Sequence, residues 1–430
     1  MLAANTVPVV GNSVAGQRGH REGCDRSGLP KGMTLAEGEV RGSVREDVTG
    51  VRAAFEQNFT DGLEVGACFC ATIDGETVAD LWGGYADAAR TRPWERDSIV
   101  NVYSVTKTMA ALTALLIADR GELDFDAPVA RYWPQFAANG KSEITVAQVM
   151  SHSAGLSGWR EPLRPEDLYD WEKATASLAA QEPFWEPGTA SGYHVVTQGF
   201  LIGEIVRRIT CRSLGTVFRE EIAEPLGADF HVGLPESEES RVAELVPPDQ
   251  EPFSDDVTEL QDNAAHNPRL DASVVNSRAW RAAEIPAGGG TGNARSVAQV
   301  HTILANGGIA QGRRFLSEAT CRKALEVQIE GRDLVLGVPV RFGLGFAVGG
   351  AFMPNSNTLF WGGAGGSLAI IDMDTRATYA YAMNKMDGGR TGDMRAFAPI
   401  FVVWEALARA GRNATEEGKA RCSAGRGNAT

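Results

Sequence analysis

The strongest hydrophobic pattern in the chain runs from Thr108 to Ala118, where Thr108 and Thr113 are the polar interruptions. A helix that is apolar all round is normally buried inside a large core. Lys107 stands at the head of this segment, one turn after Ser104. Because burying an ammonium group is costly unless it is paired or its pKa falls, this lysine needs an explanation beyond packing.

Patterns typical of strands lie near both ends of the chain. The segment "EVGACFCATIDGETVADLWGGYAD" has two apolar runs about Asp74-Gly75, which predicts a β-hairpin. Near the C-terminus four further segments read as strands: "RFGLGFAVGG", "NTLFWGG", "SLAIIDMD" and "ATYAYAMNKM".

Helical spacing precedes, separates and follows these strands. In "VREDVTGVRAAFEQNF" the apolar positions Val48, Val51, Ala54 and Phe55 fall on one helix face. "GDMRAFAPIFVVWEALARA" predicts a closing helix, and residues 104 to about 286 read as helix and loop. The segment 236–278, rich in Pro, Asp and Asn, is expected to form one wall of a crevice.

Strands at both chain ends with helices between them predict an α+β fold. The economical arrangement is one antiparallel sheet flanked by helices, with a mainly helical domain inserted. The sheet domain is expected at 43–103 plus 287–411, and the helical domain at 104–286. Residues 1–42 and 412–430 lack apolar periodicity and are expected to be a mobile arm and a flexible tail.

Composition and charge narrow the classes of partner. The chain has 43% apolar and 22% charged residues, with a formal net charge of −14. An acidic protein of this kind is not expected to bind nucleic acid or an acidic membrane surface. No apolar run has the length of a signal peptide core or of a membrane span, so a cytoplasmic location is expected.

The cysteines and histidines give no pattern of a metal or cofactor site. None of the 6 cysteines forms a C-x-x-C pair, and no H-E-x-x-H occurs. Cys68 and Cys70 alternate along a predicted strand and are expected to pack as small apolar side chains. His152 lies between Ser151 and Ser153, and this segment is interpreted as a structural turn rather than a Ser-His pair.

Ser104 and Lys107 are three residues apart, so a helix places both on one face. A serine in the first turn lies at the positive end of the helix dipole, which favours a developing oxyanion. A partly desolvated lysine has a lowered pKa and can act as the base that activates the serine. The plain alternative is a helix cap beside a solvated lysine.

Several motifs in order carry a family resemblance. "SVTK" is followed by "ITVAQVMSHSAGL", "EPGTASGYHVVTQGFLIGEIVRRIT", "PAGGGTGNARSVAQVHTILANGG" and "WGGAGGSLAIIDMDTRATYAYAMNKM". Together they resemble the serine β-lactamase and penicillin-binding protein superfamily, in its class C-like branch, and most of all the family VIII carboxylesterases. The resemblance covers about residues 45–410 and implies a β-lactamase/transpeptidase-like fold.

This resemblance implies a catalytic set. Ser104 is similar to the acylated nucleophile of the family and Lys107 to its partner base. Tyr193, in "SGYHVV", resembles the catalytic tyrosine that passes the proton to the leaving group. From its position next to Tyr193, His194 is expected to line the pocket, with packing in the core as the alternative.

The resemblance also implies a substrate-binding strand. Trp361, Gly362 and Gly363 stand where lactamases carry a lysine, threonine and glycine beside the nucleophile. Glycines there permit close approach of a substrate to the strand backbone. The backbone N–H groups of Ser104 and Ala364 would then form the oxyanion hole.

Two departures from the family pattern bear on the substrate. Val195 replaces an asparagine of the lactamase tyrosine motif, and Trp361 replaces the lysine of the strand motif. Both changes remove polar groups that would hold a β-lactam amide and carboxylate, which favours small, uncharged, short-acyl esters. A serine esterase without cofactor or metal is the expected function, and its oligomeric state is open. The alternatives are an acyltransferase, a weak β-lactamase or D-amino-acid peptidase, and a catalytically silent binding scaffold.

Overall fold

Strands from the two ends of the chain share one antiparallel sheet, as the sequence predicts. The structure is a computed structural model and describes residues 39–248, 257–350, 353–388 and 393–425. Within these residues the main sheet has nine strands in the order β1-β3-β2-β14-β13-β12-β11-β10-β9. Their bounds are β1 Arg41–Val44, β2 Gly66–Ile73, β3 Glu76–Gly84, β9 Ile329–Arg332, β10 Pro339–Phe342, β11 Ala347–Val348, β12 Thr358–Gly362, β13 Leu368–Asp372 and β14 Ala377–Met383.

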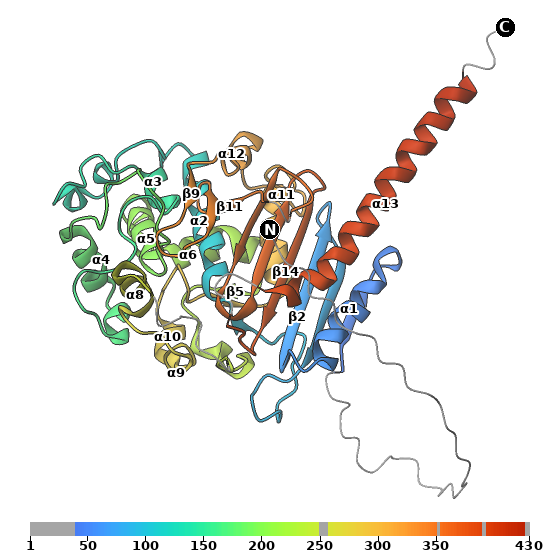
Figure 1. Cartoon of the computed structure of the whole chain (residues 1–430), viewed down its shortest axis with the longest axis horizontal. Coiled ribbons are helices and arrows are strands. Elements are labelled where there is room, and N and C mark those ends of the chain that lie inside the picture. Colours follow the sequence, from blue (N-terminus) through green and yellow to red (C-terminus); the bar gives the residue numbers. More distant parts are fainter. Residues whose placement is uncertain (1–38, 249–256, 351–352, 389–392, 426–430) are drawn as a thin grey trace, which may run out of the picture. The chain divides into compact units, whose positions relative to one another are not determined.

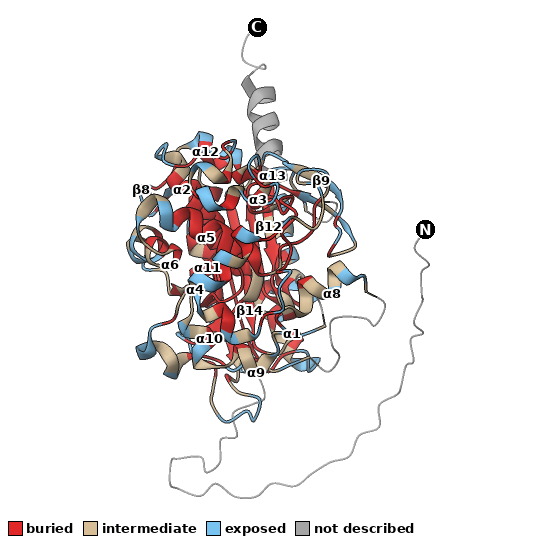
Figure 2. Ribbon diagram, turned by 90° about the vertical axis from the view of Figure 1, so that its left-hand side faces the viewer, coloured by how far each residue is buried: buried red, intermediate tan, exposed pale blue. Residues whose placement is uncertain are grey.

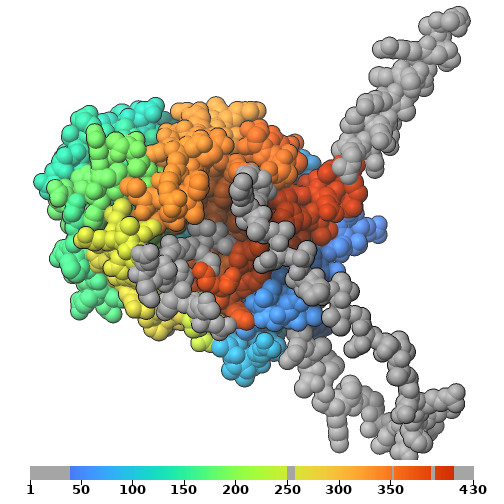
Figure 3. All heavy atoms as spheres, in the orientation of Figure 1, coloured from blue at the N-terminus to red at the C-terminus, as the bar shows by residue number. Residues whose placement is uncertain are grey.

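The N-terminal and C-terminal strands of the sheet meet where β2 pairs with β14. Its register runs from Ala67 opposite Met383 to Ile73 opposite Ala377. Figure 3 shows the consequence at the surface, where blue N-terminal and red C-terminal residues lie next to one another. The sheet is therefore complete only when both chain ends are present.

Helices cover both faces of the sheet (Figure 1). On β2 the side chains of Ala67, Phe69 and Ala71 pack in one apolar core, and those of Cys68 and Cys70 in the other. The first core includes residues of α1 (Gly50–Thr60) and α13 (Met394–Gly425), and the second includes residues of α11 (Ala294–Ala305). This alternation follows from the two-residue period of a strand. It confirms that the two cysteines pack as small apolar side chains.

The predicted hairpin forms at Asp74-Gly75. Ile73 faces Glu76 across the turn, and φ is 52° at Asp74 and 83° at Gly75. Two consecutive positive φ values define the tight turn whose twist matches that of the flanking strands. The Asp-Gly pair is suited to it because both residues tolerate this conformation.

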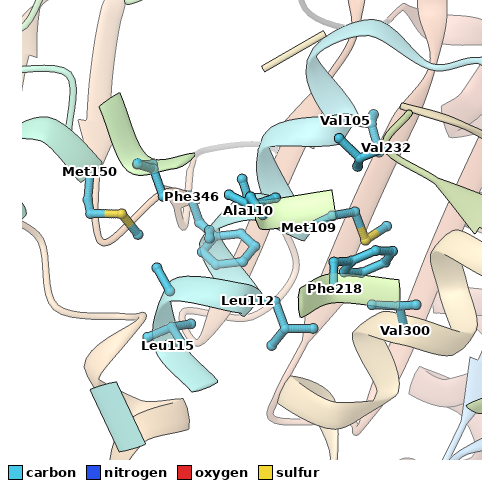
Figure 4. Packing of buried hydrophobic residues seen from close by; sticks show 14 of the residues in the cluster. Val105, Met109, Ala110, Leu112, Leu115, Met150, Phe218, Val232, Val300 and Phe346 are labelled. Atoms are coloured by element: carbon cyan, nitrogen blue, oxygen red, sulfur yellow. The ribbon is translucent and has the colours of Figure 1, made fainter. Parts of the chain in front are cut away.

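Helix α2 (Thr106–Asp119) is the buried apolar helix that the sequence predicts. Every residue from Thr106 to Ile117 is buried, Lys107 included. In Figure 4 apolar side chains surround it on several sides, with Met150 and Phe346 on one and Phe218 and Val300 on another. The buried residues of Figure 2 gather around α5, α11 and β14.

The segment between the two groups of strands is mainly helix and loop. Its helices are α3 Val146–Met150, α4 Trp171–Ala180, α5 Thr197–Thr210, α6 Leu214–Phe218, α7 Glu224–Leu226, α8 Glu259–His266, α9 Ala272–Val275 and α10 Arg278–Ala282. Helix α12 (Glu318–Lys323) follows α11, and short 3-10 turns include η1 Glu46–Val48, η2 Tyr103–Val105 and η8 Ala364–Gly366. Two small sheets join β4 Val100–Asn101, β6 Thr291–Gly292 and β5 Phe230–His231, and β7 Ile309–Ala310 with β8 Arg313–Arg314.

Several predicted boundaries differ from the structure. Strand β1 begins at Arg41, two residues inside the expected mobile arm, and the rest of that arm up to residue 38 lies outside the described residues. Helix α13 continues to Gly425, past residue 411, so most of the expected tail is helical. The segment "RFGLGFAVGG" holds the last two residues of β10 and the whole of β11, and β9 was not predicted. Short edge strands carry too few alternating residues to give a pattern.

Among the described residues, no helix combines the length and the apolar character that crossing a membrane requires.

Candidate functional site

Ser104 lies in a constrained turn between β4 and α2. The preceding residue, Tyr103, has a φ of 45°, a conformation that is uncommon for a bulky side chain. Asn101 stabilises it, since its Oδ1 accepts a 3.0 Å hydrogen bond from the Tyr103 N–H. The Asn101 amide also donates to the carbonyl oxygen of Gly288 at 3.0 Å. The backbone before α2 is thus bent so that Ser104 reaches a cavity.

The three predicted catalytic side chains meet. Lys107 Nζ lies 3.1 Å from Ser104 Oγ, and the Tyr193 hydroxyl donates to Ser104 Oγ at 2.6 Å. Lys107 Nζ also lies 4.8 Å from the centre of the Tyr193 ring. The sequence spacing brings Ser104 and Lys107 together, and the fold adds Tyr193 from the segment before α5.

Lys107 is almost inaccessible, with 1% of its surface exposed. Nζ donates to the carbonyl oxygens of Val195 at 2.7 Å and Ala287 at 2.9 Å. Neither group carries a formal charge, and burial lowers the pKa of the Lys107 ammonium well below its usual value. Burial thus destabilises the charged form of Lys107, which is the direction of change that a general base requires.

Tyr193 is held by aromatic neighbours. Its ring lies edge-on to His152 at 4.9 Å between centroids and 5.9 Å from the Trp361 ring. Burial raises the pKa of the Tyr193 phenol, which keeps the hydroxyl protonated at neutral pH. The phenol is therefore a proton donor in the resting site.

The sequence reasoning missed Asp333. Its Oδ1 accepts a 3.0 Å hydrogen bond from the Tyr193 backbone N–H, across 140 positions of sequence. The side chain is 1% exposed and lies in the loop between β9 and β10. In the sequence Asp333 is followed by the apolar run Leu334-Val335-Leu336, and this pattern does not point to Tyr193.

A tight turn at residues 363–367, called here the Gly363 turn, packs against the backbone beside Ser104. A Cβ atom at Gly363 would lie 2.1 Å from Ser367 Oγ and 2.4 Å from the Val102 carbonyl oxygen, so only glycine fits. The Ser367 hydroxyl donates to that same carbonyl at 2.7 Å. Arg395 donates to the Gly365 carbonyl oxygen at 2.6 Å from the other side.

The Gly363 turn presents Ala364 to the same cavity as Ser104. Among the residues that the structure describes, neither of their backbone N–H groups donates a hydrogen bond. Two free amides at one cavity are what a negatively charged oxygen requires.

The cavity at Ser104 has a volume of about 160 Å³. The segment 236–278 contributes Ala264, Ala265, Asn267, Pro268 and Leu270, which confirms that this segment forms one wall. No described residue that lines the cavity has a charged side chain. The other lining residues are Tyr103, Ser104, Ser157, Gly158, Trp159, Tyr193, Val195, Val196, Trp280, Ala287, Gly288, Val335, Leu336, Ala364 and Met386.

Three of the predicted substrate-binding residues lie elsewhere. Trp361 and Gly362 line a second hollow of about 390 Å³, which shares Tyr193 and Leu336 with the cavity. Gly363 lines neither space, because its small size serves packing against Ser367 and Val102.

The prediction that His194 lines the pocket is wrong. Its ring is fully buried, with Nε2 accepting from the Leu156 N–H at 3.1 Å and Nδ1 2.6 Å from the Gly192 carbonyl oxygen. Burial lowers the pKa of His194 to about 4, so it stays neutral. The Tyr193 side chain faces Ser104, whereas that of the neighbouring His194 lies in the core.

His152 belongs to the supporting structure. Its Nδ1 accepts from the His194 N–H at 3.1 Å, and its ring stacks on Trp361 with 5.4 Å between centroids. Within the described part of the chain, no group of three or more His, Cys, Asp or Glu side chains is placed to hold a metal ion.

The family model of the beta-lactamases matches residues 53–400. The chain belongs to the beta-lactamase family. Esterase/beta-lactamase LipL from Mycobacterium tuberculosis is 36% identical to this beta-lactamase family member over 351 residues, which are 77% of this chain and 80% of LipL.

Solved structures agree with this family. A family VIII carboxylesterase is 45% identical with a TM-score of 0.82, covering 86% of this chain and 100% of that one. EstA from Arthrobacter nitroguajacolicus Rue61a is 32% identical with a TM-score of 0.77, covering 86% of this chain and 99% of EstA. The α+β, β-lactamase-like fold predicted from the sequence is therefore confirmed.

Proposed function

We propose that this beta-lactamase family member is a serine carboxylesterase that cleaves small, short-acyl esters through an acyl-enzyme on Ser104. Relatives named as esterases and carboxylesterases support ester hydrolysis as the activity. The observation that carries the proposal is the contact of Ser104 Oγ with both Lys107 Nζ at 3.1 Å and the Tyr193 hydroxyl at 2.6 Å.

The hydrogen bonds around Lys107 suit a general base. A neutral amine has two N–H bonds and one lone pair. With its N–H bonds directed to the carbonyls of Val195 and Ala287, the lone pair is left for the Ser104 hydroxyl proton. Ser104 can then attack the ester carbonyl while Lys107 takes the proton.

Tyr193 completes the transfer. Its protonated phenol, next to Ser104 Oγ, gives its proton to the departing alkoxide and regains one from Lys107. In the second half-reaction the same groups take a proton from water, which attacks the acyl-enzyme, and return it to Ser104. The N–H groups of Ser104 and Ala364 stabilise the oxyanion in both halves.

The cavity favours uncharged esters over β-lactams. A β-lactam antibiotic carries a carboxylate, and burying it without a cation is costly. None of the described lining residues supplies a positive charge, and Val195 presents an apolar side chain there. A cavity of about 160 Å³ is also near the size that holds a benzene-sized molecule, which suits a short acyl group.

A paired rate assay tests the proposal. Purified protein is given p-nitrophenyl butyrate and nitrocefin, with Ser104→Ala as the inactive variant and Ser153→Ala as the matched control. We expect fast ester cleavage, slow or absent lactam cleavage, and loss of both only in Ser104→Ala. Dominant nitrocefin cleavage would show that the protein is a β-lactamase rather than an esterase.

Labelling distinguishes an inactive scaffold from an untested acyl acceptor. A p-nitrophenyl alkylphosphonate is expected to modify Ser104 and no other serine, as read by mass spectrometry of the peptides. No labelling, together with no turnover, would contradict the enzyme assignment. Labelling and burst release without turnover, followed by product formation after addition of alcohols, would identify an acyltransferase.

A further inference from the structure

Tyr193 sits in a stretch of chain without regular secondary structure. Residues 191–194 belong to no helix or strand, and α5 begins only at Thr197. Its hydroxyl must nevertheless stay within hydrogen-bond distance of Ser104 Oγ, because small misplacements of a reacting group cost large factors in rate. Some other part of the molecule has to fix this backbone.

We propose that Asp333 is the positioning residue that fixes Tyr193 for proton transfer, an inference that rests on the proposed function. Its Oδ1 accepts backbone hydrogen bonds from Tyr193 at 3.0 Å, Val335 at 2.9 Å and Leu336 at 2.8 Å. One carboxylate oxygen therefore joins the Tyr193 segment to the β9–β10 loop.

The loop around Asp333 is itself closed and paired with the Tyr193 segment. The Asp333 N–H donates to Val338 at 3.0 Å, and the Gly337 N–H donates back to Asp333 at 2.9 Å. The Leu334 N–H donates to the carbonyl oxygen of Ser191 at 2.8 Å. Asp333 contributes the only side chain among these contacts. A substitution of Asp333 therefore alters this side-chain acceptor and leaves the backbone hydrogen-bonding groups in place.

The Asp333 side chain is buried with one of its two carboxyl oxygens hydrogen-bonded. Its Oδ2 has no hydrogen-bond partner among the described residues. A buried carboxylate costs free energy unless it is well hydrogen-bonded. The negative charge acts on Tyr193 in the direction of keeping the phenol protonated, alongside the larger effect of burial on its pKa.

Asp372 offers a matched control. It is also 1% exposed, and its Oδ1 accepts backbone hydrogen bonds from Asp374 at 3.0 Å and Thr375 at 3.1 Å. It lies at the end of β13, where it touches none of the proposed catalytic residues. The two side chains differ in that Asp372 Oδ2 also accepts from Asn355 Nδ2 at 2.6 Å. Asp333→Ala and Asp372→Ala each remove a buried Oδ1 that accepts backbone hydrogen bonds.

The experiment compares these variants on two butyrate esters, one with a p-nitrophenol leaving group and one with phenol. Because phenol is the poorer leaving group, its ester depends more on a proton donor. We expect Asp333→Ala, which removes the Oδ1 acceptor, to lower kcat about 10- to 100-fold with little change in KM, and more for the phenyl ester. Asp372→Ala should lower the melting temperature similarly and leave kcat within about twofold.

A double-mutant cycle separates this inference from the proposed function. If Asp333 acts through Tyr193, Asp333→Ala has little further effect on kcat in a Tyr193→Phe background. Equal losses in both backgrounds, or equal loss from Asp372→Ala, would overturn the positioning role. A near-normal rate of Tyr193→Phe alone would instead show that Tyr193 is not part of the proposed mechanism. Should Asp333→Ala not fold, Asp333→Glu, which moves the accepting oxygen, is measured in the same two backgrounds.

Discussion

The Ser367 hydroxyl donates a 2.7 Å hydrogen bond to the carbonyl oxygen of Val102. This bond joins the Gly363 turn, which presents Ala364, to the backbone that leads into Ser104. The distance between the two proposed oxyanion amides therefore depends on a contact between residues 265 positions apart. Oxyanion stabilisation is sensitive to such geometry because the donors act only at hydrogen-bond distance.

Replacing Ser367 by alanine tests this link. We expect Ser367→Ala to lower kcat about tenfold, less than the 10²–10³ lost when an oxyanion donor is removed outright. The unfolding free energy should fall by about 1 kcal/mol for the lost hydrogen bond. Thr378→Val is the control, because the Thr378 hydroxyl donates to the Ala298 carbonyl oxygen at 3.0 Å away from the site. A similar loss of kcat in both variants would show that Ser367 does not act through the oxyanion hole.

The buried Lys107 predicts a pH dependence of stability. Its pKa is lowered in the folded protein, so between the folded and the unfolded pKa the unfolded chain binds a proton that the folded chain does not. The unfolding free energy therefore rises with pH until the unfolded lysine titrates near about 10.4. Measured by urea unfolding, the advantage of the wild type over Lys107→Met should grow by up to about 1.4 kcal/mol per pH unit above neutrality.

Lys323→Met, at an exposed lysine, controls for the general effect of losing a charge. The unfolding free energy of Lys323→Met should change with pH as that of the wild type does. If the unfolding free energy of Lys107→Met also changes in this way, Lys107 is protonated in the folded protein and cannot be the base. The same neutral amine predicts that ester turnover falls as pH drops through the lowered Lys107 pKa.

Tyr193→Phe is expected to lower kcat by about 10²–10⁴ for esters with poor leaving groups, the range for loss of a general acid. The loss should be smaller for p-nitrophenyl esters, whose alcohol departs without a proton. Tyr379→Phe, at a buried tyrosine of β14, is the matched control and should retain its rate. A uniform loss across leaving groups would assign Tyr193 a packing role.

Val195→Asn tests why the cavity favours esters. The Val195 side chain lines the cavity while its carbonyl oxygen accepts from Lys107, so the substitution adds an amide without moving the base. We expect kcat/KM for nitrocefin to rise about five- to tenfold and that for p-nitrophenyl butyrate to fall, consistent with one added hydrogen bond. An unchanged ratio of the two values would show that this position does not select the substrate.

Local sequence patterns were sufficient to predict much of the fold and part of the candidate site. The three-residue spacing of Ser104 and Lys107 and the Asp74-Gly75 turn are local features, and both appear as predicted. The resemblance supplied Tyr193, which periodicity would not have selected. These predictions succeeded because each rests on short-range geometry or on several motifs in order.

The remainder depends on contacts that no local pattern encodes. Asp333 reaches Tyr193 across 140 positions, and the apolar residues Leu334, Val335 and Leu336 that follow it do not indicate this contact. His194 was misplaced because an unpaired segment has no fixed period from which to read its facing direction. Strand β1 was missed because its four residues pair only with β3 at the edge of the sheet.

The pairing of β2 with β14 has a consequence for synthesis of the protein. A ribosome makes Gly66–Ile73 early and Ala377–Met383 near the end. Strand β2 therefore has no β14 to pair with while most of the chain is synthesised. Contacts of such large sequence separation slow folding and leave strand edges open to aggregation. A nascent chain that already contains Ser104, Lys107 and Tyr193 is thus still inactive, and chaperone demand should be highest just before the C-terminal strands leave the ribosome.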